Sequence, residues 1–277
     1  MQKIQRHVVD DRQCLRDAAA NTTIKRKYQK QLQNKLVDVL NAYNDYDMHE
    51  GNPHALMPVK MNKVEAHALK LLYGTELGEY VFLDALRTAG KSKLCPVCGS
   101  QSGATLDHYL PKTTYPEYSA YSWNLIPACF DCNTHHSDTC SGTAPNERMI
   151  HPYYDKFVDQ RILSVDITSP YWGAKVSFVP FGVKGADRDI CAWHIENVIN
   201  KTSGPARIGD IWGNIVRDKI SVQEVFGKHK DLPGLRGAVK SAMLSSDVMF
   251  GGKNNWQSAL LHGIQKNRSV LNWMLNR

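Results

Sequence analysis

The chain has no apolar run long enough to form a transmembrane helix. Its first residues, MQKIQRHVVDDRQ, have no apolar core of the kind found in signal peptides. We therefore expect a cytoplasmic protein that makes no contact with a membrane. The motif Gly-x-x-x-x-Gly-Lys-[Ser/Thr] is also absent, so any control by ATP must come from another chain. Neither internal repeats nor low-complexity segments occur.

The 277 residues include seven cysteines, but their spacing does not indicate a disulfide framework. Four lie in two Cys-x-x-Cys pairs, and the remaining three, Cys14, Cys140 and Cys191, are scattered and odd in number. The hydrophobic and charged fractions, 42% and 22%, are ordinary for a globular chain. A net charge of +7 favours a polyanionic partner, although many basic proteins never bind nucleic acid.

The apolar spacing predicts a helix-rich chain of the α+β class. Alternating β-branched and aromatic residues over 161–183 predict a hairpin, and 43–60 is expected to be a loop. Apolar stripes on the first and last expected helices would either dock a partner or complete the chain's own core. The expected helices cover residues 24–40, 63–73, 76–88, 190–201, 206–225, 233–244 and 255–275.

The two Cys-x-x-Cys pairs predict a shared metal site. Cys95 and Cys98 form the first pair, and Cys129 and Cys132 form the second. Each pair presents two thiolates to one ion, and four thiolates complete the tetrahedron that structural zinc prefers. One such pair alone would equally suit a redox motif, but two with a short insert favour zinc.

Polar residues between and after the two pairs suggest a chemical role beyond a structural zinc ribbon. Asp107 and His108 begin D-H-Y-L-P, Asn124 begins N-L-I-P, and Asn133 follows directly in C-F-D-C-N-T-H-H. This set resembles the HNH (ββα-metal) nuclease family over about forty residues. The resemblance implies a ββα-metal core in which Asp107 and Asn133 bind a catalytic cation and Asn124 orients the histidine.

The chemistry of phosphodiester hydrolysis needs these residue types. A histidine such as His108 can activate water near neutral pH, because its unperturbed pKa lies there. A hard cation, Mg²⁺ or Mn²⁺, takes oxygen ligands, which Asp107 and the amide oxygen of Asn133 supply. An asparagine can fix the imidazole tautomer by a hydrogen bond, which is the role implied for Asn124. Because neighbouring residues of a strand point to opposite faces, Asp107 and His108 must lie at a strand end or bend.

Several residues keep a structural alternative. Asn133 could be a helix N-cap and Asn124 a turn residue. His136 either contacts phosphate or faces solvent, and His135 is expected on the surface. His151 is expected to pack on the core.

A longer resemblance joins D-H-Y-L-P-K-x-x-Y-P-E-Y, the His-Pro-Tyr element at 151–153 and the closing N-x-W-Q-x-A-L helix. These segments look like the HNH subunit of Septu-type anti-phage systems, some of which occur beside retrons. The resemblance implies antiviral defence with an AAA- or ABC-type ATPase subunit as partner. Under it, Lys112 and Tyr115 either face the substrate or shape their loop.

The resemblance also suggests three regions: a helical cap over 1–90, the nuclease core over 91–157, and a hairpin with helices over 158–277. Two alternatives stay open. A zinc-ribbon module that binds nucleic acid without cleaving it would keep the four cysteines but has no use for the Asp-His-Asn set. The substrate is DNA or RNA, because a site for a phosphodiester does not itself read the 2′-hydroxyl.

Overall fold

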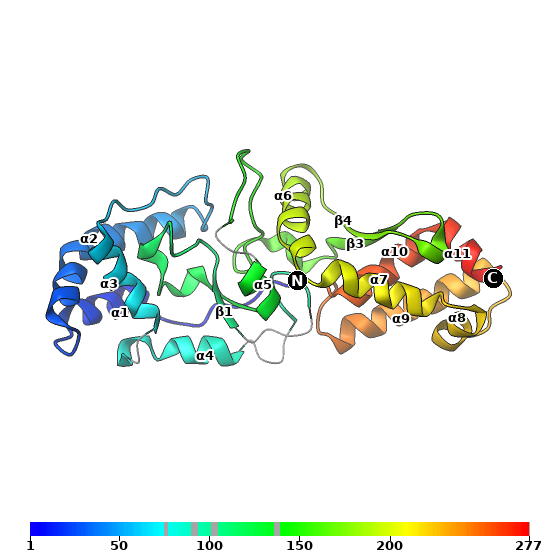
Figure 1. The fold of residues 1–277 in the computed structure, drawn as a ribbon, viewed down its shortest axis with the longest axis horizontal. Coiled ribbons are helices and arrows are strands. Elements are labelled where there is room, and N and C mark those ends of the chain that lie inside the picture. Colours follow the sequence, from blue (N-terminus) through cyan, green and yellow to red (C-terminus); the bar gives the residue numbers. More distant parts are fainter. Residues whose placement is uncertain (75–76, 90–93, 101–104, 136–138, 277) are drawn as a thin grey trace.

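The computed structural model describes residues 1–74, 77–89, 94–100, 105–135 and 139–276. It is an α+β protein, elongated in outline, with helices at both ends and two small strand pairs between them (Figure 1). In the described residues, no helix combines the length and the apolar character needed to cross a bilayer.

Four helices form the N-terminal part, and the expected helix at 24–40 is longer than predicted. The helix continues to Met48, so residues 43–48, which were expected to belong to the loop at 43–60, are helical. The helix expected over 76–88 begins later, at Phe82, after a short 3-10 helix over Gly78–Tyr80. The first helix was not predicted; the side chain of Asp10 caps it by accepting from the amide of Gln13. The four are α1 (Asp11–Ala20), α2 (Arg26–Met48), α3 (Lys63–Gly74) and α4 (Phe82–Ala89).

The central part contains one antiparallel strand pair followed by a short helix. Strand β1 (Thr105–His108) pairs with β2 (Leu125–Ala128), and His108 stands opposite Leu125. Helix α5 (Phe130–His135) follows β2 almost directly and packs against β1. The last residue of β1 is His108, so the Asp107–His108 pair lies at a strand end, as expected.

The second strand pair confirms the hairpin predicted over 161–183. Strand β3 (Leu163–Ile167) pairs antiparallel with β4 (Val176–Pro180) in a separate two-stranded sheet. Helix α10 (Trp256–Lys266) packs against β3, so this sheet supports the C-terminal helices.

The described residues after β4 form six α-helices, and two of the predicted helices are broken in two. The helix expected over 206–225 breaks because Asp218 caps a new helix through the amide of Ser221. The helix expected over 255–275 breaks where Asn267 caps the amide of Val270. The six helices are α6 (Gly185–Asn197), α7 (Gly204–Ile215), α8 (Lys219–Phe226), α9 (Leu232–Met249), α10 (Trp256–Lys266) and α11 (Arg268–Leu275).

The two apolar stripes considered as docking surfaces pack within the chain's own core. Leu32 of α2 is buried, and its neighbours on the stripe lie against the same core. Leu260, Ile264 and Leu271 on the C-terminal stripe are also buried. Both stripes therefore stabilise this fold.

Stacked and edge-to-face tyrosine pairs hold α2 against the segment between the strands of the first pair. The rings of Tyr43 and Tyr121 lie 4.0 Å apart, and those of Tyr46 and Tyr118 lie 4.9 Å apart. The Tyr118 hydroxyl donates to the carbonyl of Ala42 at 3.1 Å. Aromatic pairs at such distances add stabilisation beyond the burial of their area. The N-terminal helices thereby set the shape of the 109–124 segment.

Glu117 ties the same segment to the loop after α2. One carboxylate oxygen, Oε1, accepts from the amide of Val59 at 2.9 Å. The other, Oε2, is buried and has no hydrogen-bond partner among the described residues. Burial raises the pKa of Glu117 to about 7, because the charged form loses its hydration.

This raised pKa predicts a stability that falls as pH rises. The folded chain holds the Glu117 proton more tightly than the unfolded chain, so the free energy of unfolding should decrease between about pH 4.5 and pH 7. Replacing Glu117 by Gln removes this titration. Relative to wild type, Glu117→Gln should gain about 3 kcal/mol between pH 5 and pH 8 in urea denaturation, as an order of magnitude. The exposed control Glu224→Gln should leave the pH dependence unchanged, and an equal result for both variants would contradict the prediction.

Candidate metal centre and candidate active site

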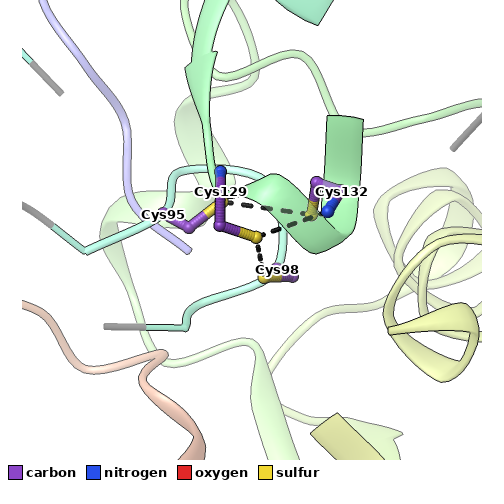
Figure 2. A group of neighbouring side chains, drawn as sticks. All are labelled: Cys95, Cys98, Cys129 and Cys132. Atoms are coloured by element: carbon purple, nitrogen blue, oxygen red, sulfur yellow. Dashed lines mark hydrogen bonds between the residues drawn. The ribbon is translucent and has the colours of Figure 1, made fainter. Parts of the chain in front are cut away.

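The four cysteines of the two Cys-x-x-Cys pairs lie together, as predicted. Their sulfur atoms are all within 4.8 Å of one another, and the four residues are buried (Figure 2). The Sγ atoms of Cys95 and Cys132 are 4.0 Å apart, and those of Cys98 and Cys129 are 3.6 Å apart. A tetrahedron with zinc–sulfur bonds of about 2.3 Å has edges of about 3.8 Å. The cluster therefore has the size and the donor atoms to hold a metal ion such as zinc.

Backbone amides point at the sulfur atoms. The amides of Ser100, Cys129 and Cys132 lie 3.4 Å from the Sγ atoms of Cys98, Cys95 and Cys129 respectively. Such donors stabilise thiolate charge and orient metal ligands. All seven cysteines are free of disulfides, so the four thiols are available to a metal.

Side chains from distant parts of the chain hold the first Cys-x-x-Cys loop. Buried His194 of α6 donates from Nε2 to the carbonyl of Val97 at 2.8 Å, and its Nδ1 accepts from the amide of Ile150 at 3.2 Å. The indole nitrogen of Trp256 donates to the carbonyl of Cys98 at 2.7 Å. The C-terminal helices thus fix the position of the thiol cluster.

The Asp107–His108 pair lies at the end of β1, with the two side chains in different environments. Asp107 is half-buried, and its Oδ1 accepts from the amide of His108 at 2.7 Å. His108 is 8% exposed, and its Nε2 lies 2.9 Å from the carbonyl oxygen of Ser119. Because a carbonyl only accepts, Nε2 carries the hydrogen, and Nδ1 of the neutral ring carries the lone pair. His108 therefore offers Nδ1 as its basic atom.

Aromatic and cationic groups surround the His108 ring. The Tyr73 ring lies 4.5 Å from it, and the Tyr73 hydroxyl donates to the carbonyl of Leu106 at 2.7 Å. The pKa of His108 is lowered to about 4, mainly because the buried charged ring loses hydration and in smaller part because of the charge of Lys112, while the hydrogen bond to Ser119 acts in the opposite direction. Exposed Lys112 and half-buried Arg87 both lie over the Tyr73 ring, at 5.0 and 5.4 Å. The ring is therefore uncharged at neutral pH. Its pKa lies below the near-neutral value on which the expectation of a general base relied, so His108 is a weaker base than the sequence suggested.

Asn124 supports the loop after β1. Its Oδ1 accepts from the amide of Leu110 at 2.7 Å and from the Tyr46 hydroxyl at 3.3 Å. Its Nδ2 donates to the carbonyls of Leu110 and Tyr118, at 3.0 and 3.2 Å. The hydrogen bond from Asn124 to His108 that the sequence suggested is not among these contacts, and the carbonyl beside His108 Nε2 belongs to Ser119. Its complete burial also gives it more contacts than a simple turn residue has.

Asn133 lies exposed on α5, beside β1. Helix α5 begins at Phe130, so the alternative that Asn133 is a helix N-cap is wrong. His135 is exposed, as expected, and His136 lies outside the described residues. The structure thus brings the Asp107–His108 pair and the helix of Asn133 together.

Three further residues contribute to the environment of the Asp107–His108 pair, and the sequence analysis did not identify them. Tyr73 was expected only as the end of a helix, and Arg87 as an ordinary helix position. Ser119 acts through its backbone carbonyl, which leaves no signal in a sequence. Of the two loop residues considered, Lys112 is exposed and Tyr115 is buried against Tyr118, which suits a loop-shaping role for Tyr115. His151 is buried, with Nε2 3.0 Å from the Tyr46 hydroxyl, and packs in the core.

Comparisons with known proteins add one distant similarity. Protein ea31 of Escherichia phage lambda is 32% identical to the chain over 137 residues, which cover 46% of this chain and 44% of the phage protein. The chain therefore spans less than half the length of this relative. No family model matches the chain, and no solved structure matches it.

The thiol cluster predicts a metal-dependent fold. The purified protein should contain one zinc per chain, and Cys95→Ser or Cys132→Ser should lose it. Both variants should melt at lower temperature and be less soluble, because binding of a structural metal contributes directly to folding free energy. Cys14→Ser, which changes a half-buried cysteine outside the cluster, should keep metal and melting temperature. Elemental analysis and thermal melts measure both effects, and a cooperatively melting wild type without zinc contradicts the assignment.

Proposed function

We propose that this chain is a metal-dependent HNH endonuclease that hydrolyses phosphodiester bonds of nucleic acid. The observation that carries the proposal is the state of His108. Its ring is neutral, its Nε2–H is bound to Ser119, and its basic Nδ1 lies at a strand end next to Asp107. A strand pair followed by a helix that packs on it supports the ββα-metal core.

In the proposed reaction, His108 Nδ1 takes a proton from water as the water oxygen attacks phosphorus. The new phosphorus–oxygen bond forms while the bond to the leaving oxygen breaks. Asp107 and Asn133 offer the carboxylate and amide oxygens that would hold Mg²⁺ or Mn²⁺. A bound divalent cation offsets charge on the scissile phosphate and the leaving oxygen. Among the described residues, no side-chain hydrogen bond engages Asn133, so its amide oxygen is available.

The remaining residues have supporting parts in the proposal. Zinc in the thiol cluster holds the first Cys-x-x-Cys loop to the start of α5, which fixes Asn133 relative to β1. Tyr73 packs on His108, and the positive charges of Lys112 and Arg87 attract the phosphate backbone. Asn124 stabilises the loop that carries the Ser119 carbonyl, by donating to the carbonyl of the preceding residue, Tyr118.

His108→Ala should reduce cleavage by roughly 10²- to 10⁴-fold, because a general base contributes about that much to the rate. Zinc content and circular dichroism should stay as in wild type. His135→Ala, at an exposed histidine of α5, is the matched control and should cleave normally. Turnover is measured on mixed DNA and RNA substrates with and without added Mg²⁺ or Mn²⁺.

Two results would contradict this proposal. Near-normal cleavage by a folded His108→Ala protein removes the histidine from the reaction. A zinc-loaded wild type that binds nucleic acid but never cleaves it, with either cation, is instead a non-catalytic zinc-ribbon module.

An ATPase partner is the second part of the proposal, and it rests on the resemblance to Septu-type HNH subunits. The absence of a phosphate-binding loop motif fits a chain that does not bind ATP in this way itself. Because the apolar stripes of α2 and of α10–α11 serve the chain's own core, a partner would use other surface. Val248 and Met249 on α9, 84% and 74% exposed, are apolar residues of that kind.

Co-expression with the neighbouring gene product should give a stable complex of AAA- or ABC-type ATPase and nuclease. Size-exclusion chromatography with mass measurement gives its composition. A Val248→Ser/Met249→Ser double variant tests whether the exposed apolar residues of α9 contribute to formation of the complex. Val37→Ser, at an exposed apolar residue of α2, is the control. A chain that elutes alone and cleaves at full rate alone contradicts the partnership and leaves the nuclease.

A further inference from the structure

A cavity of about 360 Å³ lies beside the thiol cluster, between α5 and the C-terminal helices. Phe130 and Asp131 of α5, Arg207 of α7, and Trp256 with Gln257 of α10 line it. Its size lies at the lower end of the range for small-molecule sites and suits one nucleoside-sized group. Cys129 of the thiol cluster also lines the cavity, so the cavity adjoins the metal centre, but the proposed reaction does not use it.

The walls of the cavity are fixed by hydrogen bonds. Asp131 accepts from the amide of Ser203 at 3.1 Å and from its hydroxyl, which joins α5 to the start of α7. Trp256 is held by its bond to the carbonyl of Cys98. Both hydrogen bonds go to one carboxylate oxygen, Oδ2, which is therefore held at the start of α7. The cavity is therefore built before any ligand arrives.

Three side chains at the cavity have unused binding capacity. Phe130 is 70% exposed, which is unusual for a large aromatic ring. Exposed Arg207 forms no ion pair with any described residue. The hydroxyl of Ser100 is buried and bonds to none of the described residues. An exposed ring, a cation and a hydroxyl without partner together suit a ligand with a flat face, a negative charge and polar edges.

The position of Phe130 relates the cavity to the proposed cation ligand. Phe130 and Asn133 are three residues apart on α5, so they lie on neighbouring positions of one helix face. Their separation along the helix axis is about 4.5 Å. Successive nucleotides of one strand rise by about 3.4 Å in a duplex. A strand with its scissile phosphate near Asn133 would therefore bring the adjacent nucleotide to Phe130.

We propose that Phe130, Arg207 and the cavity between them form a subsite for the nucleotide next to the scissile phosphate. The inference rests on the proposed nuclease function. The base stacks on Phe130 at the mouth of the cavity, and Arg207 binds the phosphate of that nucleotide. Because every base has a stacking face, this subsite binds without strong sequence preference. Its contribution is to affinity and to the placement of the strand.

The test measures binding apart from cleavage. Fluorescein-labelled single-stranded DNA and RNA of mixed sequence and equal length are titrated in anisotropy measurements without added divalent cation. Phe130→Ala should raise the Kd by roughly 5- to 100-fold, the effect of losing one base–aromatic stack. Phe130→Tyr should restore binding, and Phe130→Leu should not, since it is apolar but cannot stack. Arg207→Ala should reduce the slope of log K against log salt by about 0.7, the loss of one phosphate contact.

Matched controls come from the same chain. Trp172→Ala removes a 73% exposed ring from the β3–β4 connection, and Arg16→Ala removes an exposed cation from α1. Both should bind as wild type does. Because Phe130 and Arg207 are exposed, their variants should fold, and unchanged zinc content checks this.

The outcomes separate the subsite from the nuclease proposal. Unchanged affinity in Phe130→Ala overturns the subsite, even if wild type cleaves. Equal restoration by Phe130→Leu overturns the stacking, because an apolar contact with the strand would then be sufficient. A wild type that binds through Phe130 but never cleaves supports the subsite and contradicts the nuclease. A wild type that binds neither DNA nor RNA overturns both.

Discussion

Four buried sulfur atoms around one point can be deprotonated together only if a cation lies among them, because like charges so close repel strongly away from water. In this chain the four come from two sites far apart in sequence, one before β1 and one at the junction of β2 and α5. An ion shared by the four sulfur atoms would join the strand pair and the helix into one unit. It would thereby help to keep α5 packed beside β1.

A second constraint on the candidate site is that the buried polar groups of the loop after β1 must form hydrogen bonds. Asn124 uses both ends of its amide on the loop after β1, and Tyr46 reaches it from α2. Through this loop the N-terminal helices hold the Ser119 carbonyl, which fixes the tautomer of His108. A ring held in one tautomer needs no reorganisation before it accepts a proton. The N-terminal helices are thus part of the candidate site, although they supply none of its proposed reacting atoms.

The sequence predicted well what depends on local spacing. The thiol cluster, the hairpin at β3–β4 and the strand end at His108 follow from motifs of a few residues. Helix boundaries were less accurate, because Asp218 and Asn267 start new helices by capping, inside apolar patterns that run on without interruption. Tyr73 could not be found, since it reaches His108 only through the tertiary packing of α3, and Arg87 of α4 could not, since it contacts Tyr73 in the same way. Ser119 contributes a backbone atom, so no residue type marks its role.

Trp256 has a consequence for how the protein can be observed. Its indole nitrogen is bound to the carbonyl of Cys98, one of the four thiol residues, and its side chain also lines the cavity beside α5. Indole emission depends on hydrogen bonding and on the polarity around the ring. The emission of this one tryptophan should therefore respond to two separate events. One is the release of an ion from the sulfur atoms, and the other is the binding of a ligand in the cavity beside them. Each would change its spectrum without any added label.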